Sequence, residues 1–360
     1  MVHLRFALDL HHKLAGKGNF CFSPYSVASA LTLVARAARG GTAAELETLL
    51  GDLDGHQELL HAAAKLPSED AVLTVANTLW AWDELPLAEP FLRELESWPA
   101  GAVRSAPFVT DPERARQVIN ADVAETTRDL IPELLDSGAV DADTVASVVN
   151  ALYLRTSWAT PFPDGDTAPG EFTTPSGVRS VPMMRISERL GYAEHAGWTV
   201  VSVPAAGDVE AVVLLPGGDL TEREPDLDAA LVGDLLAART DTQISLTMPK
   251  LRLDERADLV DALGTLGVRT VFGPGADLGN LSPDPRLVVS DVQHQAVLRL
   301  DENGLEGAAA TAAMIRMVAF IPDEAEVRVD RPFLLLVRHA PTGALYFLAR
   351  VSVPSWESAE

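Results

Sequence analysis

The sequence predicts an α+β fold with large mixed or antiparallel β-sheets, and two observations carry this prediction. Helical patterns dominate the first half of the chain, whereas strand-like runs dominate from residue 144 onward. One clear helical pattern, residues 256–268, interrupts those runs. A doubly wound parallel sheet would alternate strands and helices regularly, so the second half of the chain argues against it. We find no internal repeat or low-complexity linker, and therefore expect residues 1–360 to form a single domain.

The first half of the chain contains recognisable helix starts and ends. Ser23 is in position to cap a helix, with Pro24 at the first helical position and Gly40 at the end. The segment 41–51 repeats this pattern, because Thr42 and Glu45 have the spacing of a capping box. Further helices are expected at residues 6–14, 90–95 and 111–127.

The strand predictions rest on β-branched content and on the alternation of apolar with polar residues. The first candidate, residues 71–82, lies between helices. The others follow in the second half, at residues 144–156, 180–185, 197–203, 209–215, 243–253, 286–300, 327–338 and 344–353.

The charge balance excludes two classes of partner. The 360 residues include 52 acidic and 28 basic side chains, for a formal net charge of −24. Such a chain repels nucleic acid phosphates and anionic lipids, so we expect neither nucleic acid nor a membrane as a partner. It also lacks the run of about 20 apolar residues that a membrane-spanning helix requires.

The N-terminus and the composition suggest a compartment and a source. No secretory signal is visible, so we expect a cytoplasmic protein as the sequence is written, or a secreted one if a leader has been removed. The basic residues are nearly all Arg, with Lys only at positions 13, 17, 65 and 250, and Ala and Pro are plentiful. We interpret this composition as that of a GC-rich bacterial genome and of a thermostable protein.

No constellation of catalytic residues stands out. The chain has no G-x-S-x-G elbow, phosphate-binding glycine loop, dinucleotide fingerprint or H-E-x-x-H motif. The spacing of the eight histidines does not favour a helical metal site, and we expect no metal and no cofactor. The single cysteine, Cys21, lies between two Phe residues, which favours a buried thiol over a nucleophile. An acidic hydrolase with unrecognised catalytic carboxylates remains an alternative.

His294 lies on the apolar face of a predicted strand. Val292, His294, Ala296 and Leu298 alternate with Gln293 and its neighbours, so the imidazole is expected to point into an apolar layer. A core imidazole hydrogen-bonded to buried partners is favoured over a catalytic or metal-binding role.

Residues 301–322 form an unusually apolar segment for a loop. After Asp-Glu-Asn-Gly the chain runs through small residues into Met314, Ile315 and Phe320. Before Pro322 it contains no proline, so every backbone N–H from 305 to 321 could join a β-ladder. With period 2, the row that begins at Leu305 is small and mostly apolar, whereas Glu306 and Arg316 fall on the other face. The segment could therefore become a strand, although exposed segments of this kind are aggregation hazards.

Several blocks of sequence resemble the serpin family. "LDENGLEGAAATAAM" resembles the hinge of inhibitory serpins, in which an acidic-x-Gly turn precedes Glu and a run of Ala and Thr. Further blocks agree along nearly the whole chain: "NFCFSPYSVASALTLVARAARGGTAAEL", "VANTLWAW", "INADVAETT", "VVNALYLRTSWATPF", "LTMPKLRL", "LGVRTVFGPGADL" and "DRPFLLLVRHAPTGALYFLARVSVP". The resemblance implies a serpin fold with three β-sheets, about eight or nine helices and an exposed reactive loop at about 302–322. A C-terminal tail, 354–360, follows the final strand.

The same resemblance implies roles for individual residues. The hinge and inserting half of the loop comprise Glu302, Gly304, Leu305, Glu306, Gly307, Ala308, Ala309, Ala310 and Thr311. The reactive bond is expected at Val318–Ala319, with Arg316 or Met317 as alternates. Ser23, Ser26, Asn150 and His294 resemble the shutter beneath the opening sheet, and Trp158 the aromatic residue at the breach.

The implied function is suicide inhibition of a serine protease by a protein that is not itself an enzyme. The protease cleaves the bait, and the hinge then enters the central sheet and traps the covalent acyl-enzyme complex. The bait suits chymotrypsin-, subtilisin- or elastase-like proteases, and Arg316 keeps a trypsin-like target open. The region between residues 51 and 71 is short and not basic, so no heparin-like activator is expected, and we expect a monomer.

Two positions depart from the family pattern. Leu305 stands where a small Thr or Ser is usual, and Gly307 stands where Ala is common. Both bear on the rate of insertion, because Leu305 must enter a narrow gap and Gly307 loosens a strand. A non-inhibitory serpin that acts as a binding or chaperone module is therefore the main alternative.

Overall fold

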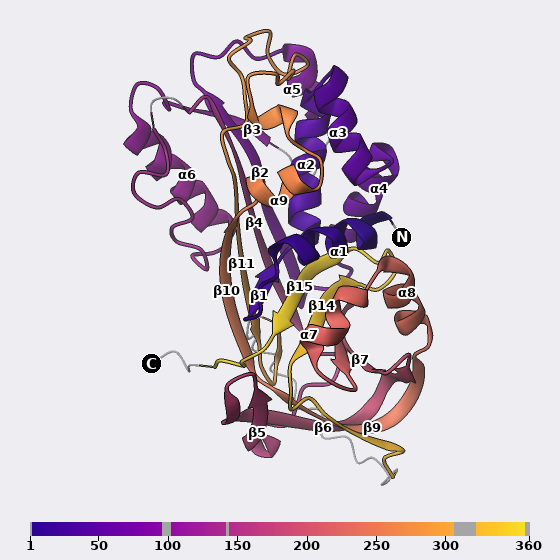
Figure 1. The fold of residues 1–360 in the computed structure, drawn as a ribbon. Coiled ribbons are helices and arrows are strands. Elements are labelled where there is room, and N and C mark those ends of the chain that lie inside the picture. Colours follow the sequence, from indigo (N-terminus) through magenta and orange to yellow (C-terminus); the bar gives the residue numbers. More distant parts are fainter. Residues whose placement is uncertain (1, 96–101, 142–143, 306–321, 357–360) are drawn as a thin grey trace.

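The computed structural model describes residues 2–95, 102–141, 144–305 and 322–356 (Figure 1). These residues form nine α-helices and fifteen strands. The helices are α1 (Val2–Leu14), α2 (Pro24–Ala37), α3 (Gly40–Leu50), α4 (Leu53–Ala63), α5 (Glu89–Leu95), α6 (Pro112–Thr126), α7 (Leu220–Arg223), α8 (Ala229–Ala237) and α9 (Val260–Thr265). The strands are β1 (Phe20–Phe22), β2 (Ala71–Trp82), β3 (Ala102–Ala106), β4 (Ala146–Ser157), β5 (Ala168–Thr174), β6 (Gly177–His195), β7 (Trp198–Ala205), β8 (Val209–Pro216), β9 (Thr240–Pro249), β10 (Leu251–Asp258), β11 (Val292–Leu300), β12 (Gly304–Leu305), β13 (Ala325–Arg328), β14 (Phe333–His339) and β15 (Leu345–Val351).

A six-stranded sheet has the order β10-β11-β12-β4-β2-β3. The helix α6 covers one face of this sheet, while α1 to α4 lie on the other side of it (Figure 1). Under α6, the apolar residues Ala115, Ile119 and Val123 pack with residues of β2 and β4 such as Trp80 and Val149. The strands β4 and β11 are buried on both faces because helices or another sheet cover each side.

The second sheet has nine strands, with the order β1-β15-β14-β8-β7-β6-β9-β13 and β5 paired to β6. The 19-residue strand β6 connects its two parts. Residues 177–183 of β6 pair with β5, residues 183–192 with β9, and residues 191–195 with β7. The three sheets expected from the resemblance thus appear in the described residues as two hydrogen-bonded sheets, because β6 runs continuously from one part of the nine-stranded sheet into the other.

The expected N-cap of α2 is present, whereas the expected cap of α3 is wrong. Ser23 accepts a hydrogen bond from the backbone N–H of Ser26 and so caps α2. Gly40 does not end α2 but begins α3, and no side chain caps α3 at Arg39. The side chains expected to form the capping box serve tertiary contacts instead. Thr42 Oγ1 accepts from the N–H of Asp277 at 3.0 Å, and Glu45 accepts from the N–H groups of Arg269 and Thr270, each at 2.8 Å.

Several boundaries also differ from the sequence prediction. The run 243–253 is divided at Lys250 into β9 and β10, which belong to different sheets. The run 327–338 is likewise divided into β13 and β14, and residues 286–291 lie outside β11. Of the helix predicted at 256–268, only the residues of α9 (Val260–Thr265) are helical, and residues 256–258 belong to β10. The helix α8 was not predicted, although Asp228 caps it by accepting from the N–H of Leu231 at 2.8 Å.

Candidate functional site

The candidate site is the end of the six-stranded sheet at which β12 lies between β11 and β4. Leu305 pairs with Leu300 of β11 on one side and with Thr156 of β4 on the other, antiparallel to both. Further along, β11 and β4 pair directly and in parallel, residues 292–295 with 148–151. Residues 296–299 of β11 and 152–155 of β4 lie between these two pairings. The two residues of β12 therefore form the beginning of a middle strand between two parallel strands.

Gly304 is required by the close approach of β12 to β4. A Cβ atom at this position would lie 2.1 Å from the carbonyl oxygen of Thr156 and 2.8 Å from the Cα of Ser157. Both contacts are with backbone, so no side-chain rotation could relieve them. Only glycine permits the chain to enter the sheet at this point.

Leu305 completes the entry by burying its side chain. It is 1% exposed and belongs to the apolar cluster that includes Leu154 and Leu298. Burying a leucine side chain contributes about 2 kcal/mol to stability. The departure from a small residue at this position therefore adds apolar contact to the start of the middle strand.

Trp158 fixes the turn that precedes β12. Its indole Nε1–H donates to the carbonyl oxygen of Asp301 at 2.7 Å, and its backbone N–H donates to the carbonyl of Asn303 at 2.9 Å. The indole ring packs edge-on against Phe162, whose backbone N–H donates to the carbonyl of Glu302 at 2.9 Å. Three successive residues of the turn are thus bound to the segment that follows β4.

Glu302 is a buried carboxylate with two side-chain partners. Lys250 Nζ lies 2.7 Å from one carboxylate oxygen, and Thr167 Oγ1 donates to the other at 2.7 Å. Burial opposes the charged form, but the hydrogen bonds from Lys250 and Thr167 outweigh it and lower the pKa of Glu302. Lys250 also lies 4.3 Å from the ring centroid of Trp356, so the start of the C-terminal tail packs against the body of the protein.

Ser23, Ser26, Asn150 and His294 lie together deep beneath the sheet, as a closed cycle of hydrogen bonds. The N–H of Ser23 donates to His294 Nε2 at 3.0 Å, and His294 Nδ1 lies 2.8 Å from Asn150 Oδ1. Asn150 Nδ2 donates to the carbonyl of Ser26 at 2.6 Å, and the N–H of Ser26 donates to Ser23 Oγ at 3.1 Å. The cycle connects α2 to β4 and β11 at the point where these strands are directly paired.

The partners of His294 determine its protonation. Nε2 accepts from the Ser23 N–H, so the ring proton is on Nδ1, from which it is donated to Asn150. Burial lowers the pKa of His294 from 6.5 to about 3, because the charged imidazolium would lose its hydration there. The neutral imidazole is therefore a structural connector between β4 and β11.

Comparison with known proteins identifies the family. A family model described as "Serpin (serine protease inhibitor)" matches residues 2–354. The chain belongs to the serpin family.

The relatives and structural neighbours agree with this assignment. The leukocyte elastase inhibitor of Bos taurus is 32% identical over 373 residues, which cover 98% of each chain. The Iris protein of Ixodes ricinus is 32% identical and covers 95% of this chain and 96% of its own. Uncleaved ovalbumin superposes with a TM-score of 0.88 at 23% identity, covering 98% of this chain and 99% of its own. Thyroxine-binding globulin in complex with thyroxine superposes with a TM-score of 0.87 at 24% identity, covering 99% of each chain, so the fold is that of a serpin. The relatives named here are animal proteins, and the comparisons give no support to the bacterial origin or thermostability expected from composition.

Part of the expected serpin site lies outside the described residues. This is so for the inserting residues Glu306, Gly307, Ala308, Ala309, Ala310 and Thr311, and for the bait residues Arg316, Met317, Val318 and Ala319. Glu302, Gly304, Leu305 and the residues of the hydrogen-bonded cycle are described, with the contacts given above.

Sequence reasoning missed three polar residues of this serpin's site. Asn77 of β2 contacts the amide of Asn150, while Lys250 and Thr167 hold Glu302. Asn77 could have been found, since strand periodicity puts it on the same face as the apolar residues Val75 and Leu79. Lys250 and Thr167 could not, because they meet Glu302 only through the packing of β9, β10 and the turn before β5.

Three other kinds of site were considered: a reactive cysteine, a metal centre and a membrane-spanning helix. Cys21 is 1% exposed, and burial raises the pKa of its thiol, so it is not poised as a nucleophile. Among the described residues, no group of three or more His, Cys, Asp and Glu side chains is placed to hold a metal ion. None of the described helices has the length and apolarity to span a membrane.

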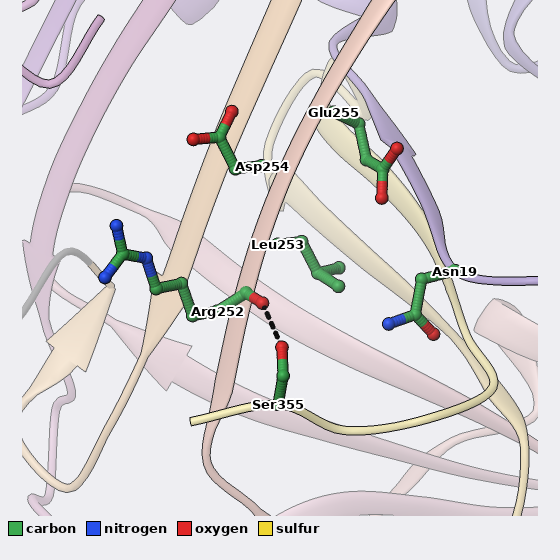
Figure 2. A pocket seen from close by; sticks show the side chains of 6 residues that line it. All are labelled: Asn19, Arg252, Leu253, Asp254, Glu255 and Ser355. Atoms are coloured by element: carbon green, nitrogen blue, oxygen red, sulfur yellow. Dashed lines mark hydrogen bonds between the residues drawn. The ribbon is translucent and has the colours of Figure 1, made fainter. Parts of the chain in front are cut away.

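A hollow of about 380 Å³ lies beside the edge strand β10, where the start of the tail crosses it (Figure 2). The hydroxyl of Ser355 donates to the carbonyl of Arg252, and the N–H of Arg252 donates to the carbonyl of Ser355, both at 2.8 Å. The lining combines both charges with one apolar side chain: Asn19, Arg252, Leu253, Asp254, Glu255 and Ser355. These contacts attach the tail to the sheet edge.

Proposed function

We propose that this serpin is a suicide-substrate inhibitor of serine proteases, which traps the acyl-enzyme by inserting its cleaved loop into the six-stranded sheet. The observation that carries the proposal is the position of β12, antiparallel between two strands that are parallel to each other. A strand that continues from Leu305 in this register would separate β4 from β11 and pair with both.

If the strand continued in the register of β12, each following residue would pair with both neighbouring strands. Successive residues from 306 to 313 would meet residues 299 to 292 of β11 and 155 to 148 of β4. Thr311 would then lie opposite His294 and Asn150, which are directly paired in the present structure. Insertion must break the 2.8 Å contact between these two side chains, and Thr311 would supply a hydroxyl between them. The run of Ala and Gly from 307 to 310 supports the proposal, because small side chains pass most easily between two packed strands.

The energetics favour insertion after cleavage. About ten newly paired residues at roughly 1 kcal/mol per net hydrogen bond give on the order of 10 kcal/mol before side-chain burial is counted. In the intact loop, both ends are held by the body of the protein, which opposes this gain. The native state is therefore a kinetic trap that persists because of a barrier.

The chemistry of trapping belongs to the protease. Its serine attacks the reactive bond, for which we propose Val318–Ala319, and forms an ordinary acyl-enzyme. Insertion then carries the attached protease along the sheet, and displacing its catalytic groups by about 1 Å slows deacylation greatly. Met317 and Val318 suit chymotrypsin-, subtilisin- or elastase-like specificity pockets. The serpin itself performs no catalysis, acts as a monomeric single domain and needs no heparin-like activator.

The test is incubation of the purified protein with chymotrypsin and with subtilisin, followed by a denaturing gel. An adduct that resists SDS, together with stoichiometric loss of protease activity, supports the proposal. Clean cleavage of the loop without inhibition would instead support a non-inhibitory serpin module. Turnover of added substrates by the protein alone would support an enzyme.

A further inference from the structure

The segment 127–136, which follows α6 and is called the strap below, crosses the face of the six-stranded sheet that α6 covers. It leaves α6 by a sharp turn, because Arg128 and Asp129 both have left-handed backbone conformations, with φ angles of 52° and 60°. Such angles are unfavourable for residues other than glycine. The guanidinium group of Arg128 lies 5.3 Å from the ring centroid of Tyr153. The start of the strap therefore contacts β4.

Two polar side chains of α6 hold the strap. Asn120 Oδ1 accepts from the N–H groups of Leu134 and Leu135 at 3.1 and 2.8 Å, and its Nδ2 donates to the carbonyl of Leu135 at 2.9 Å. Arg116 donates to the same carbonyl at 2.9 Å and forms an ion pair with Glu133. Because α6 packs on β2 and β4, the strap belongs to that side of the sheet.

The far end of the strap reaches β10, near the other edge of the sheet. Arg256 of β10 lies 2.7 Å from a carboxylate oxygen of Asp136, and it donates to the backbone carbonyl of Glu133 at 2.6 Å. Between the two ends, Leu134 belongs to the apolar cluster that includes Val297 of β11. In the strand order β10-β11-β12-β4, the strap thus bridges the line along which β11 and β4 meet.

Arg256 lies level with the part of this line that is still closed. It is the cross-strand partner of Gln295, which pairs directly with Ala151 of β4. A strand inserted between β4 and β11 would move them apart by about 4.8 Å, one interstrand spacing. The strap is held to α6 and stays with β4, whereas Arg256 moves away with β10 and β11. Both contacts of Arg256 with the strap must then break.

We propose that Arg256 and the strap form a latch that opposes the separation of β4 from β11. The inference rests on the proposed function and deepens it, because it assigns part of the barrier against insertion to contacts outside the loop. Arg256 is a positioning residue, whose charge-assisted hydrogen bonds stabilise the closed sheet and are lost in the open one. Its side chain is 36% exposed and that of Asp136 is 77% exposed, so the latch adjusts the barrier and does not create it.

The latch should affect the intact and the cleaved protein differently. Without it, the closed sheet is less stable while the open sheet is unchanged, so the barrier to opening falls. The intact protein should then lose its inhibitory activity on heating about fivefold faster. The cleaved protein should melt as before, because insertion has already broken the contacts of Arg256.

The experiment compares Arg256→Gln, Asp136→Asn and their combination with the wild type. Chymotrypsin inhibition after heating gives the half-life of the intact protein, and thermal melts are recorded before and after loop cleavage. We expect R256Q to shorten the half-life about fivefold. D136N should shorten it less, because the hydrogen bond to the Glu133 carbonyl remains, and the double variant should add nothing beyond R256Q.

Arg104→Gln is the matched control. Arg104 of β3 forms an ion pair with Asp122 of α6, and both lie on the same side of the line between β4 and β11. Opening of the sheet leaves this pair intact, so R104Q should keep the wild-type half-life.

The outcomes separate this inference from the function on which it rests. If the wild type forms no adduct with chymotrypsin or subtilisin and gains no heat resistance on cleavage, the proposed function fails. If the wild type inhibits and R256Q keeps its half-life, only the latch is refuted. A melting temperature of R256Q that falls equally in the intact and cleaved forms would also refute it, because Arg256 would then stabilise both states alike.

Discussion

Replacing Gly304 with alanine should expel β12 from the sheet. The added Cβ would lie 2.1 Å from the carbonyl oxygen of Thr156, far inside van der Waals contact, and the atoms it meets are backbone. The strand β4 cannot move aside locally, because it is paired along its length with β2. We therefore expect the hinge to leave its position between β4 and β11.

The expected loss in unfolding free energy follows from the contacts that β12 makes in the sheet. Leu305 is 1% exposed, and returning a leucine to water costs about 2 kcal/mol. The backbone hydrogen bonds of β12 to its two neighbours contribute about 1 kcal/mol each in net terms. Expulsion should thus lower the free energy of unfolding by about 4 kcal/mol, and it should slow insertion after cleavage because the first step must be made against the same clash.

The assay is denaturant unfolding of the intact protein, followed by the stoichiometry of chymotrypsin inhibition. Gly218→Ala is the control, because a Cβ there meets nothing within 4 Å. We expect G304A to unfold at a lower denaturant concentration and to be cleaved largely as a substrate, while G218A behaves as the wild type. A G304A protein with wild-type stability and inhibition would refute the assignment of β12 as the start of insertion.

Further predictions concern the turn and the buried histidines. Trp158→Phe removes the indole N–H that donates to the Asp301 carbonyl at 2.7 Å and should cost about 1–2 kcal/mol in unfolding free energy, and an unchanged denaturation midpoint would contradict this role. Burial lowers the pKa of His3, His11 and His294 from 6.5 to about 3 in each case, so between these values the unfolded chain binds protons that the folded protein does not. Stability should therefore fall as the pH falls from about 6.5 toward 3, by about 1.4 kcal/mol per pH unit for each histidine. His294→Gln should reduce the slope of unfolding free energy between pH 4 and 6 by that amount, whereas an unaltered slope would show that His294 is protonated in the folded protein.

Elements whose signals are local were predictable from the sequence. Ser23 was predictable as the N-cap of α2, because it directly precedes Pro24 at the first helical position and accepts from a backbone N–H of the first turn. His294 lies on the buried face because strand alternation is strict once its apolar neighbours fix the face. The segment 71–82 was predicted with the bounds of β2, since its β-branched content and alternation agree along its length.

The failures arise where distant parts of the chain decide the outcome. Glu45 has the sequence of a capping box, but the free N–H groups of Arg269 and Thr270 compete for its carboxylate. Nothing near Lys250 in sequence shows that β9 and β10 enter different sheets. The place of β12 between β4 and β11 depends on a register that only the assembled sheet defines.

The most direct measurement is the thermal stability of the protein before and after cleavage of its loop by a catalytic amount of protease. If residues that follow Leu305 take the middle position between β4 and β11, the nicked protein should resist heat far better than the intact one. Among residues 152–155 and 296–299, the backbone amides that do not already bond to β2 or β10 should become protected from exchange. A nicked protein with the same melting temperature, and with those amides as open to exchange as before, would contradict the proposed insertion.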